Sequence, residues 1–197
     1  MKVLPRRFYD RDPRDVAPEL LNKVLRVGDR SGRIVETEAY CGSIDPGAHS
    51  YRGMTPRTEV MFGPPGKLYV YLSYGMHWCC NPTCGPEGEG WAVLIRAVEP
   101  LSGIDEMRPL RPKAKRDLDL ANGPGKLTQA LGILGTHNGA DLVTGDVGIT
   151  IVDDATPPPT DPVVTWRIGF GQNPARDFPW RWFVPGDRHV SRREGAR

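Results

Sequence analysis

The chain has 197 residues, with 26 Lys and Arg against 24 Asp and Glu, so its formal net charge is only +2 and its sequence pI is about 8.4. This length predicts one domain with room for a hydrophobic core. The near balance of charge excludes few kinds of partner. No apolar run approaches the ~18 residues of a membrane span, and the N-terminus lacks the apolar core of a secretory signal. We therefore expect a cytoplasmic protein whose cysteines stay reduced.

The N-terminal part of the chain predicts a helix and then a strand. Asp15 is placed as the helix N-cap, with Pro18 in the first turn and an apolar stripe formed by Leu20, Leu21, Val24 and Leu25. Residues 33–40 (RIVETEAY) combine β-branched residues with period-two alternation, which is typical of a strand. A polar, glycine-rich loop follows.

The strand at residues 33–40 carries the most informative pattern. Period two puts Ile34, Glu36, Glu38 and Tyr40 on one face, with two carboxylates and a phenol side by side. A buried unpaired charge is costly, so an acid kept on a strand that buries a face often has a chemical function. The alternative is a solvated strand face with Tyr40 at its edge.

Residues 63–81 predict a turn followed by a hairpin. Residues 67–74 alternate Tyr with aliphatic residues, Gly75 breaks the strand, and residues 76–81 return as its second arm. Tyr74 at the turn would project outward, where an exposed ring suits stacking or wedging, although it could instead fold back onto the sheet. On the two arms, Tyr69 and Tyr71 share one face and Cys79 shares a face with Asn81, so a thiol and an amide could form one pocket wall.

A zinc site is a second interpretation of the same region, because His77, Cys79, Cys80 and Cys84 are close in sequence. Cys79 and Cys80 are adjacent, however, and would point to opposite faces of a strand, and no second CxxC supplies further ligands. We prefer small buried thiols and predict no metal.

The remaining segments complete an α+β pattern. Residues 91–98 predict a strand in which Arg96 needs an anionic partner that Glu36 or Glu38 could supply. Residues 101–120 look helical but are interrupted by Pro109 and Pro112. Further elements are a helix at 122–131 and short strands at 147–152, 163–170 and 182–184. Together they predict one compact domain over residues 1–197 with a flexible Arg-rich end from about residue 192.

Two basic features could contact phosphate. Glycines at the start of the helix at 122–131 expose backbone N–H groups beside Lys126, although the spacing of a Walker motif is absent. Seven arginines follow Trp166, and a solvated Arg-rich end is the alternative to phosphate contact there.

Seven motifs, taken in order, resemble the alkyladenine (3-methyladenine) DNA glycosylase family in the form shared by bacteria and vertebrates. They are IVETEAY, His49 nine residues after Tyr40, RGxTPR, MFGPPGKLYVYLSYGM, Cys79-x-Asn81, VLIRAVEP and NGPGKLTQAL, spread from about Phe8 to Ser191. The resemblance implies a monomeric base excision repair enzyme, without cofactor, on the nucleoid in the bacterial cytoplasm. It would flip a damaged purine from double-stranded DNA into a pocket and hydrolyse the N-glycosidic bond, leaving an abasic site. It also implies an α+β fold with a curved, antiparallel-rich sheet, surrounding helices and a protruding β-hairpin.

By this resemblance Glu38 is the general base that activates the attacking water. Arg96, His49 and the main-chain carbonyl of Ile168 would hold the water and the acid. No lysine takes a Schiff-base role, which implies a monofunctional enzyme. Two further classes stay open from the residues alone: a non-catalytic nucleic-acid-binding module, and a metal-dependent hydrolase that uses the Glu, His and Cys side chains.

The resemblance also assigns residues to the base and to the DNA. The rings that would sandwich the flipped base are Tyr40, His49 and Tyr71, and Asn81 would discriminate against the guanine amino group. Tyr74 would fill the vacated stack, and DNA-backbone contacts are implied for Met76, Arg57, Arg111 and Lys126. The sequence differs from the vertebrate pattern at His77, Trp78 and Cys80, and its loop after His49 is shorter. These differences leave open which lesions besides 3-methyladenine are substrates; the candidates are 7-methylguanine, hypoxanthine and ethenoadenine.

Overall fold

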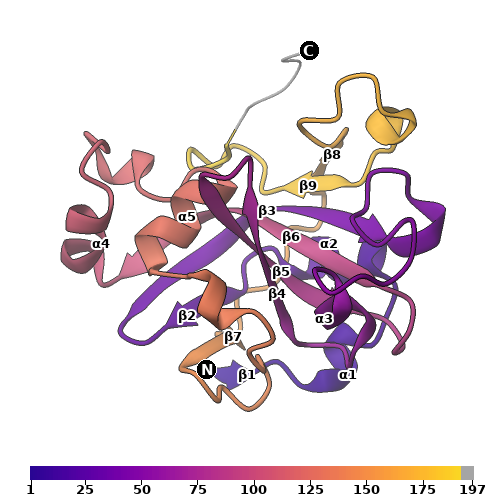
Figure 1. Cartoon of the computed structure of the whole chain (residues 1–197). Coiled ribbons are helices and arrows are strands. Elements are labelled where there is room, and N and C mark those ends of the chain that lie inside the picture. The colour runs from indigo at the N-terminus through magenta and orange to yellow at the C-terminus, as the bar shows by residue number, and fades with distance from the viewer. Residues whose placement is uncertain (192–197) are drawn as a thin grey trace.

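A curled antiparallel sheet forms the centre of the computed structural model, which describes residues 1–191 (Figure 1). The predicted flexible end from about residue 192 lies outside the described residues. The strands are β1 (Lys2–Val3), β2 (Val24–Val27), β3 (Arg30–Cys41), β4 (Leu68–Ser73), β5 (His77–Cys84), β6 (Trp91–Ser102), β7 (Ile149–Asp153), β8 (Val163–Thr165) and β9 (Arg181–Phe183). Their order is β1-β7-β2-β3-β6-β5-β4, and β9 pairs with both β3 and β8. The predicted α+β fold with its curved, antiparallel-rich sheet is confirmed.

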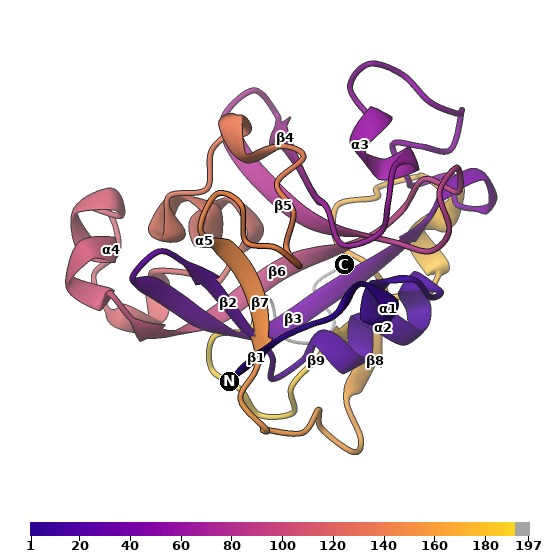
Figure 2. The ribbon, with the colours of Figure 1, turned by 90° about the horizontal axis from the view of Figure 1, so that it is seen from below.

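Short helices cover the sheet at its two ends. They are α1 (Arg6–Tyr9), α2 (Pro13–Leu20), α3 (Glu59–Phe62), α4 (Ile104–Leu110) and α5 (Pro124–Leu131), with 3-10 turns at Gly42–Ile44, Asp117–Asp119, Gly135–His137 and Pro174–Asp177. Figure 2 shows α4 and α5 toward one end of the sheet and α1 and α2 toward the other. No helix within residues 1–191 is long and apolar enough to cross a membrane.

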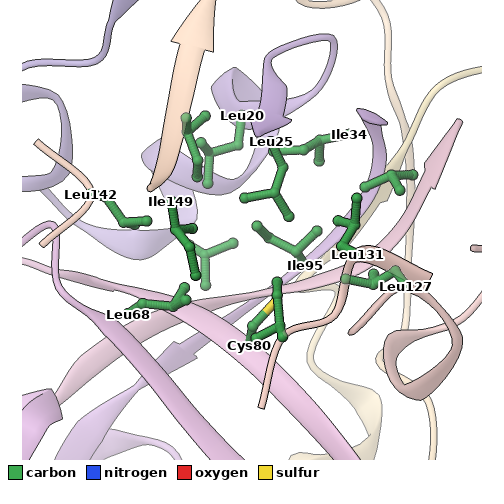
Figure 3. Close-up of a cluster of buried hydrophobic side chains, with 14 of the residues drawn as sticks. Leu20, Leu25, Ile34, Leu68, Cys80, Ile95, Leu127, Leu131, Leu142 and Ile149 are labelled. Carbon is green, nitrogen blue, oxygen red and sulfur yellow. The ribbon is translucent and has the colours of Figure 1, made fainter. Parts of the chain in front are cut away.

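The main apolar cluster lies between the sheet and these helices (Figure 3). Leu20 from α2, Leu25 and Ile34 from the sheet and Leu131 from α5 are fully buried in it. Cys80 belongs to the same cluster, and all four cysteines are free and buried, as predicted from their small apolar side chains. This close-packed core holds one face of β3 and β6 rigidly, so the side chains on their other face have fixed positions.

Strand β3 is longer than predicted and its alternation is interrupted. Its pairing with β6 shifts register between Ile34 and Glu36 and again between Glu36 and Thr37. Such bulges re-aim side chains. Ile34 therefore packs in the apolar cluster with Ala39, and the prediction that it shares a face with the two acids is wrong.

Three predicted elements differ most from the observed boundaries. Helix α2 is capped by Asp12, whose side chain accepts from Arg14 N, and Pro13 occupies its first position, so the predicted cap at Asp15 is wrong. The helix ends at Leu20, and Val24 and Leu25 lie in β2.

The other two large differences fall in the C-terminal half of the chain. Of residues 101–120, only 104–110 form an α-helix, since β6 runs on to Ser102 and the chain leaves the helix before Pro112. The predicted strand at 163–170 stops at Thr165. The residues after it form a loop that reaches the cleft described below.

The β4–β5 hairpin protrudes from the sheet beside α5, as predicted (Figure 1). Helix α5 supports the hairpin close to its turn, because Thr128 Oγ1 donates to the Trp78 carbonyl at 2.7 Å. A Cβ added at Gly125 would come within 2.6 Å of the His77 side chain, so this glycine is what allows the helix to approach so closely.

Candidate active site

Glu38, in the middle of β3, is fully buried and held by three donors. Its Oε2 accepts from the Tyr40 hydroxyl at 2.9 Å. Its Oε1 accepts from the Ile168 backbone N–H at 2.8 Å and lies 3.2 Å from Arg96 Nη1. These charge-assisted and hydrogen-bonded contacts fix the carboxylate in one orientation.

Glu36, two residues earlier, is held by side chains and backbone of the surrounding fold. Its Oε1 accepts from Arg96 Nε at 2.9 Å and Arg181 Nε at 2.7 Å, and Ser191 donates its N–H to Oε2 and its hydroxyl to Oε1. Burial alone would raise the pKa of Glu36, but the two arginines and Ser191 outweigh it and the pKa lies below the ordinary value. Glu36 is a satisfied structural acid.

Arg96 connects the two acids. Its Nε contacts Glu36 and its Nη1 contacts Glu38, so the predicted pairing with one acid or the other proves to be a pairing with both. Burial disfavours the charged guanidinium, but the two carboxylates more than compensate and raise the pKa of Arg96 above its ordinary value. One buried cation therefore serves both carboxylates.

An open cleft of about 590 Å³ lies over this cluster. The three groups that contact Glu38 line it: Tyr40, Arg96 and Ile168. Glu38 itself lies directly behind them. A narrower pocket of about 80 Å³ adjoins the cleft and shares Tyr40, His49 and Tyr71 with it. The cleft therefore leads from an aromatic slot to the wall that holds Glu38.

Two further rings pack against the aromatic residues of this junction. Tyr71 stacks on Tyr69, with centroids 5.5 Å apart, and contacts His49 edge-on at 4.5 Å. Tyr40 stacks on Phe170 at 6.3 Å. The structure thus brings together the three residues predicted to stack on a base. It adds Tyr69, which lines the narrower pocket, and Phe170, which lines the larger cleft.

These rings are neutral near pH 7. Burial, followed by the nearby Arg57, lowers the pKa of His49 to about 4. Burial and the neighbouring Glu38 raise the pKa of Tyr40 well above its ordinary value. The slot therefore presents polarisable, uncharged faces, which suit a planar and electron-poor ring.

Asn81 and Cys79 line this region from β5, as their shared parity predicts. Asn81 is buried beside the narrower pocket and donates Nδ2–H to the Tyr69 carbonyl at 3.0 Å. Cys79 lines the larger cleft, and burial raises the pKa of its thiol. A protonated thiol is a small apolar wall here rather than a nucleophile.

The loop after β8 is fixed by a buried ion pair. Arg167 Nη1 and Nη2 contact the two Asp45 oxygens at 2.6 and 2.7 Å, and both side chains are fully buried. Nη1 also donates to the Ala39 carbonyl at 2.9 Å, and the guanidinium lies 4.7 Å from the Tyr40 ring centroid. Phe170 sits directly on Gly47, where an added Cβ would approach the ring to 2.0 Å. This loop delivers the Ile168 N–H to Glu38.

Sequence reasoning missed several of these residues. Tyr69 was considered only as a partner of Tyr71 on one strand face, and the structural roles of Asp45, Arg167, Phe170 and Ser191 were not recognised. Asp45 precedes Pro46-Gly47 in a stretch that reads as an ordinary turn, and Arg167 and Phe170 fall in a predicted strand. The one available signal was the segment Arg167-Ile168-Gly169, from which the family resemblance implies that the Ile168 carbonyl binds the water. The contact that the structure shows is between the Ile168 N–H and Glu38.

The hairpin tip exposes a cluster of large side chains. Tyr74 is 84% exposed and Met76 71% exposed. Tyr74 and Gly75 both have positive φ, and Met76 N–H donates to the Ser73 carbonyl, which makes a tight turn. A tyrosine in the left-handed region is uncommon. The prediction that Tyr74 projects outward is confirmed.

The other predicted DNA contacts are dispersed. Arg57 is exposed, lines the cleft and lies 5.4 Å from the Tyr71 centroid. Lys126 is exposed on α5 and donates to Asn122 Oδ1. Arg111 uses its guanidinium within the fold, donating to Leu120, Gln129 and Asp119. Their contacts with DNA remain predictions.

The zinc alternative receives no geometric support. Within residues 1–191, no three His, Cys, Asp or Glu side chains converge to hold a metal ion. Cys79 faces the cleft whereas Cys80 faces the core, as adjacent strand residues should.

Comparisons with known proteins identify the family of this chain. The family model described as methylpurine-DNA glycosylase (MPG) matches residues 7–188. A relative from Burkholderia lata is 59% identical over 190 residues, which cover 96% of this chain and 91% of the relative. Relatives from Methanoculleus marisnigri and Carboxydothermus hydrogenoformans are 48% and 46% identical, and each alignment covers 97% of this chain and 100% of the relative. All three carry the name "Putative 3-methyladenine DNA glycosylase".

The fold, the cleft and the similarity to these relatives together define a DNA glycosylase of base excision repair. More narrowly, the chain belongs to the methylpurine-DNA glycosylase family.

Proposed function

We propose that this protein, acting as a monomer on the nucleoid in the bacterial cytoplasm, flips alkylated purines out of duplex DNA and hydrolyses their N-glycosidic bond with a water activated by Glu38. The observation that supports this most strongly is the position of Glu38. It is buried immediately behind Tyr40, Arg96 and Ile168, which both contact it and line the cleft.

The chemistry assigns one step to each group. The water oxygen forms a bond to the sugar C1′ while the bond from C1′ to the purine nitrogen breaks, and that electron pair leaves with the base. Glu38 accepts the proton of the water, and its negative charge stabilises the oxocarbenium character that develops at the sugar. Arg96 orients Glu38, and His49 with the Ile168 carbonyl orients the water. The products are the free base and an abasic site.

The substrate class follows from the same chemistry. Alkylation at N3 or N7 makes the purine cationic, so it departs as a neutral base without being protonated. A neutral slot of Tyr40, His49 and Tyr71 gains from stacking on such an electron-poor ring. We propose 3-methyladenine as the fastest substrate. 7-Methylguanine is also cationic but carries the 2-amino group that Asn81 is proposed to disfavour, and hypoxanthine and ethenoadenine are slower because they need a proton to leave.

Tyr74 is proposed as the wedge. An exposed ring at the end of a rigid hairpin can enter the base stack and fill the space that the flipped nucleotide vacates. Met76, Arg57, Arg111 and Lys126 are proposed to contact the DNA backbone. Asn81, which lines the narrower pocket, is proposed to disfavour the guanine amino group by occupying the space that this group would need.

The deciding experiment compares Glu38→Gln with the native chain on duplexes that each contain one lesion, with and without a chelator. The native enzyme should release the base and leave the strand intact until alkali is added. Glu38→Gln should bind lesion DNA yet release no base, while Glu87→Gln, at an exposed acid, should match the native rate. An active Glu38→Gln protein would overturn the role of Glu38. Binding without release by the native chain would point to a non-catalytic module, and loss of activity in chelator to a metal enzyme.

A further inference from the structure

Tyr69 lines the narrower pocket and contacts the neighbouring His49 ring edge-on. It is almost fully buried, its ring is stacked on Tyr71, and its carbonyl accepts from Asn81. Its hydroxyl lies 3.1 Å from His49 Nδ1. The phenol is therefore held at both ends, with its oxygen directed at one nitrogen of the imidazole.

The proton between these two atoms is placed by the chemistry of the two groups. At 3.1 Å either atom could donate, depending on the tautomer of His49. A phenol O–H is a stronger donor than a neutral imidazole N–H, and an unprotonated imidazole nitrogen is a stronger acceptor than a phenol oxygen, so Tyr69 donates and His49 Nδ1 accepts. Burial raises the pKa of the Tyr69 phenol, and the charge of Arg57, which lies 5.4 Å from the neighbouring Tyr71 ring centroid, opposes that rise and strengthens the phenol as a donor.

This arrangement specifies the tautomer of His49. A histidine whose pKa lies near 4 carries one ring proton at neutral pH. With Nδ1 accepting from Tyr69, that proton is on Nε2, the nitrogen left to reach a molecule in the cleft that the ring lines.

We propose that Tyr69 is a positioning residue that holds His49 as its Nε2–H tautomer, so that His49 meets the cleft as a hydrogen-bond donor. His49 then binds an oxygen acceptor (the attacking water, or an oxygen of the sugar-phosphate backbone) and cannot compete with Glu38 for the proton of that water. The donor role toward the substrate rests on the proposed function, whereas the tautomer itself does not.

The test is the nitrogen-15 NMR spectrum of the histidine rings in the free native protein at neutral pH, with the His49 signals assigned by their loss in His49→Gln. We expect protonated Nε2 and unprotonated Nδ1. Tyr69→Phe removes only the hydroxyl, and it should shift His49 to a mixture of tautomers. Tyr51→Phe, at an exposed tyrosine, should leave the His49 signals unchanged. A native His49 protonated at Nδ1, or an unaltered His49 spectrum in Tyr69→Phe, would overturn the proposal.

Activity supplies the second readout. Tyr69→Phe should slow single-turnover excision roughly tenfold, the effect of one misoriented hydrogen bond, without weakening lesion binding. An unchanged excision rate would refute the donor role of His49. If the native chain shows the expected tautomer but releases no base, the proposed function fails while the assignment of the tautomer stands.

Discussion

The two acids of β3 should respond in opposite ways to the same substitution, and this can be worked out from their contacts. Glu36→Gln removes a charge that faces Arg96 and Arg181. Its amide oxygen can accept at the Oε1 position, but the amide NH₂ then faces the Ser191 N–H, which also donates. Breaking a buried ion pair from one side costs about 3–5 kcal/mol.

Glu38→Gln should cost far less stability. The amide oxygen can still accept from the Ile168 N–H, the Tyr40 hydroxyl can rotate to accept from the NH₂, and Arg96 keeps Glu36. We expect a loss of about 1 kcal/mol. For a domain of this length each kcal/mol lowers the melting temperature by about 2–4 °C. The melting temperature should therefore fall by about 6–20 °C in Glu36→Gln and by about 2–4 °C in Glu38→Gln.

Thermal unfolding followed by circular dichroism measures the first quantity, and single-turnover excision at a temperature where both variants are folded measures the second. Glu36→Gln should keep excision within about tenfold of the native rate, whereas Glu38→Gln should lose it. Glu87→Gln, at an exposed acid, should change neither. A Glu38→Gln variant less stable than Glu36→Gln, or a folded Glu36→Gln protein that cannot excise, would refute this division of roles between the two acids.

Two further predictions concern the hairpin tip and acid stability. Tyr74→Ala should leave the melting temperature nearly unchanged, because the ring is exposed. It should slow the flipping of the lesion, which a fluorescent base beside the lesion reports. Native flipping kinetics in the variant would count against the role of Tyr74 as the wedge. The folded-state pKa of Glu36 lies below its ordinary value of 4.5, so the stability that this group contributes is complete above about pH 4.5 and is lost as the pH falls through the lower folded value. Denaturant unfolding between pH 6 and 3 should therefore show a steeper loss for the native chain than for Glu36→Gln, and parallel curves would contradict the assignment.

Features that depend on local periodicity were predictable from the sequence. The shared face of Tyr69 and Tyr71, the exposed Tyr74 and the opposite directions of Cys79 and Cys80 all follow from a two-residue repeat and a glycine turn. The pairing of Arg96 with acids on β3 followed from the cost of burying an unpaired cation.

Features that depend on tertiary contact were not predictable. The bulges in β3 come from its register with β6, and they send Ile34 to the core. The ion pair between Asp45 and Arg167 joins residues 122 positions apart. Nothing in either local sequence distinguishes that pair from solvated surface charges, so the loop that carries Ile168 and Phe170 to the cleft could not be placed.

The division between the two acids has the same origin. Glu36 and Glu38 are equally buried on one strand and share Arg96, so neither burial nor their common cation separates them. What separates them is where later parts of the chain arrive. Arg181 and Ser191 return to Glu36 and saturate it with donors, whereas Glu38 receives one backbone N–H from a loop and two groups that themselves line the cleft. An acid whose oxygens all accept from donors within the fold can only stabilise the fold. The acid whose partners face the cleft is the one placed to exchange a proton with a bound water.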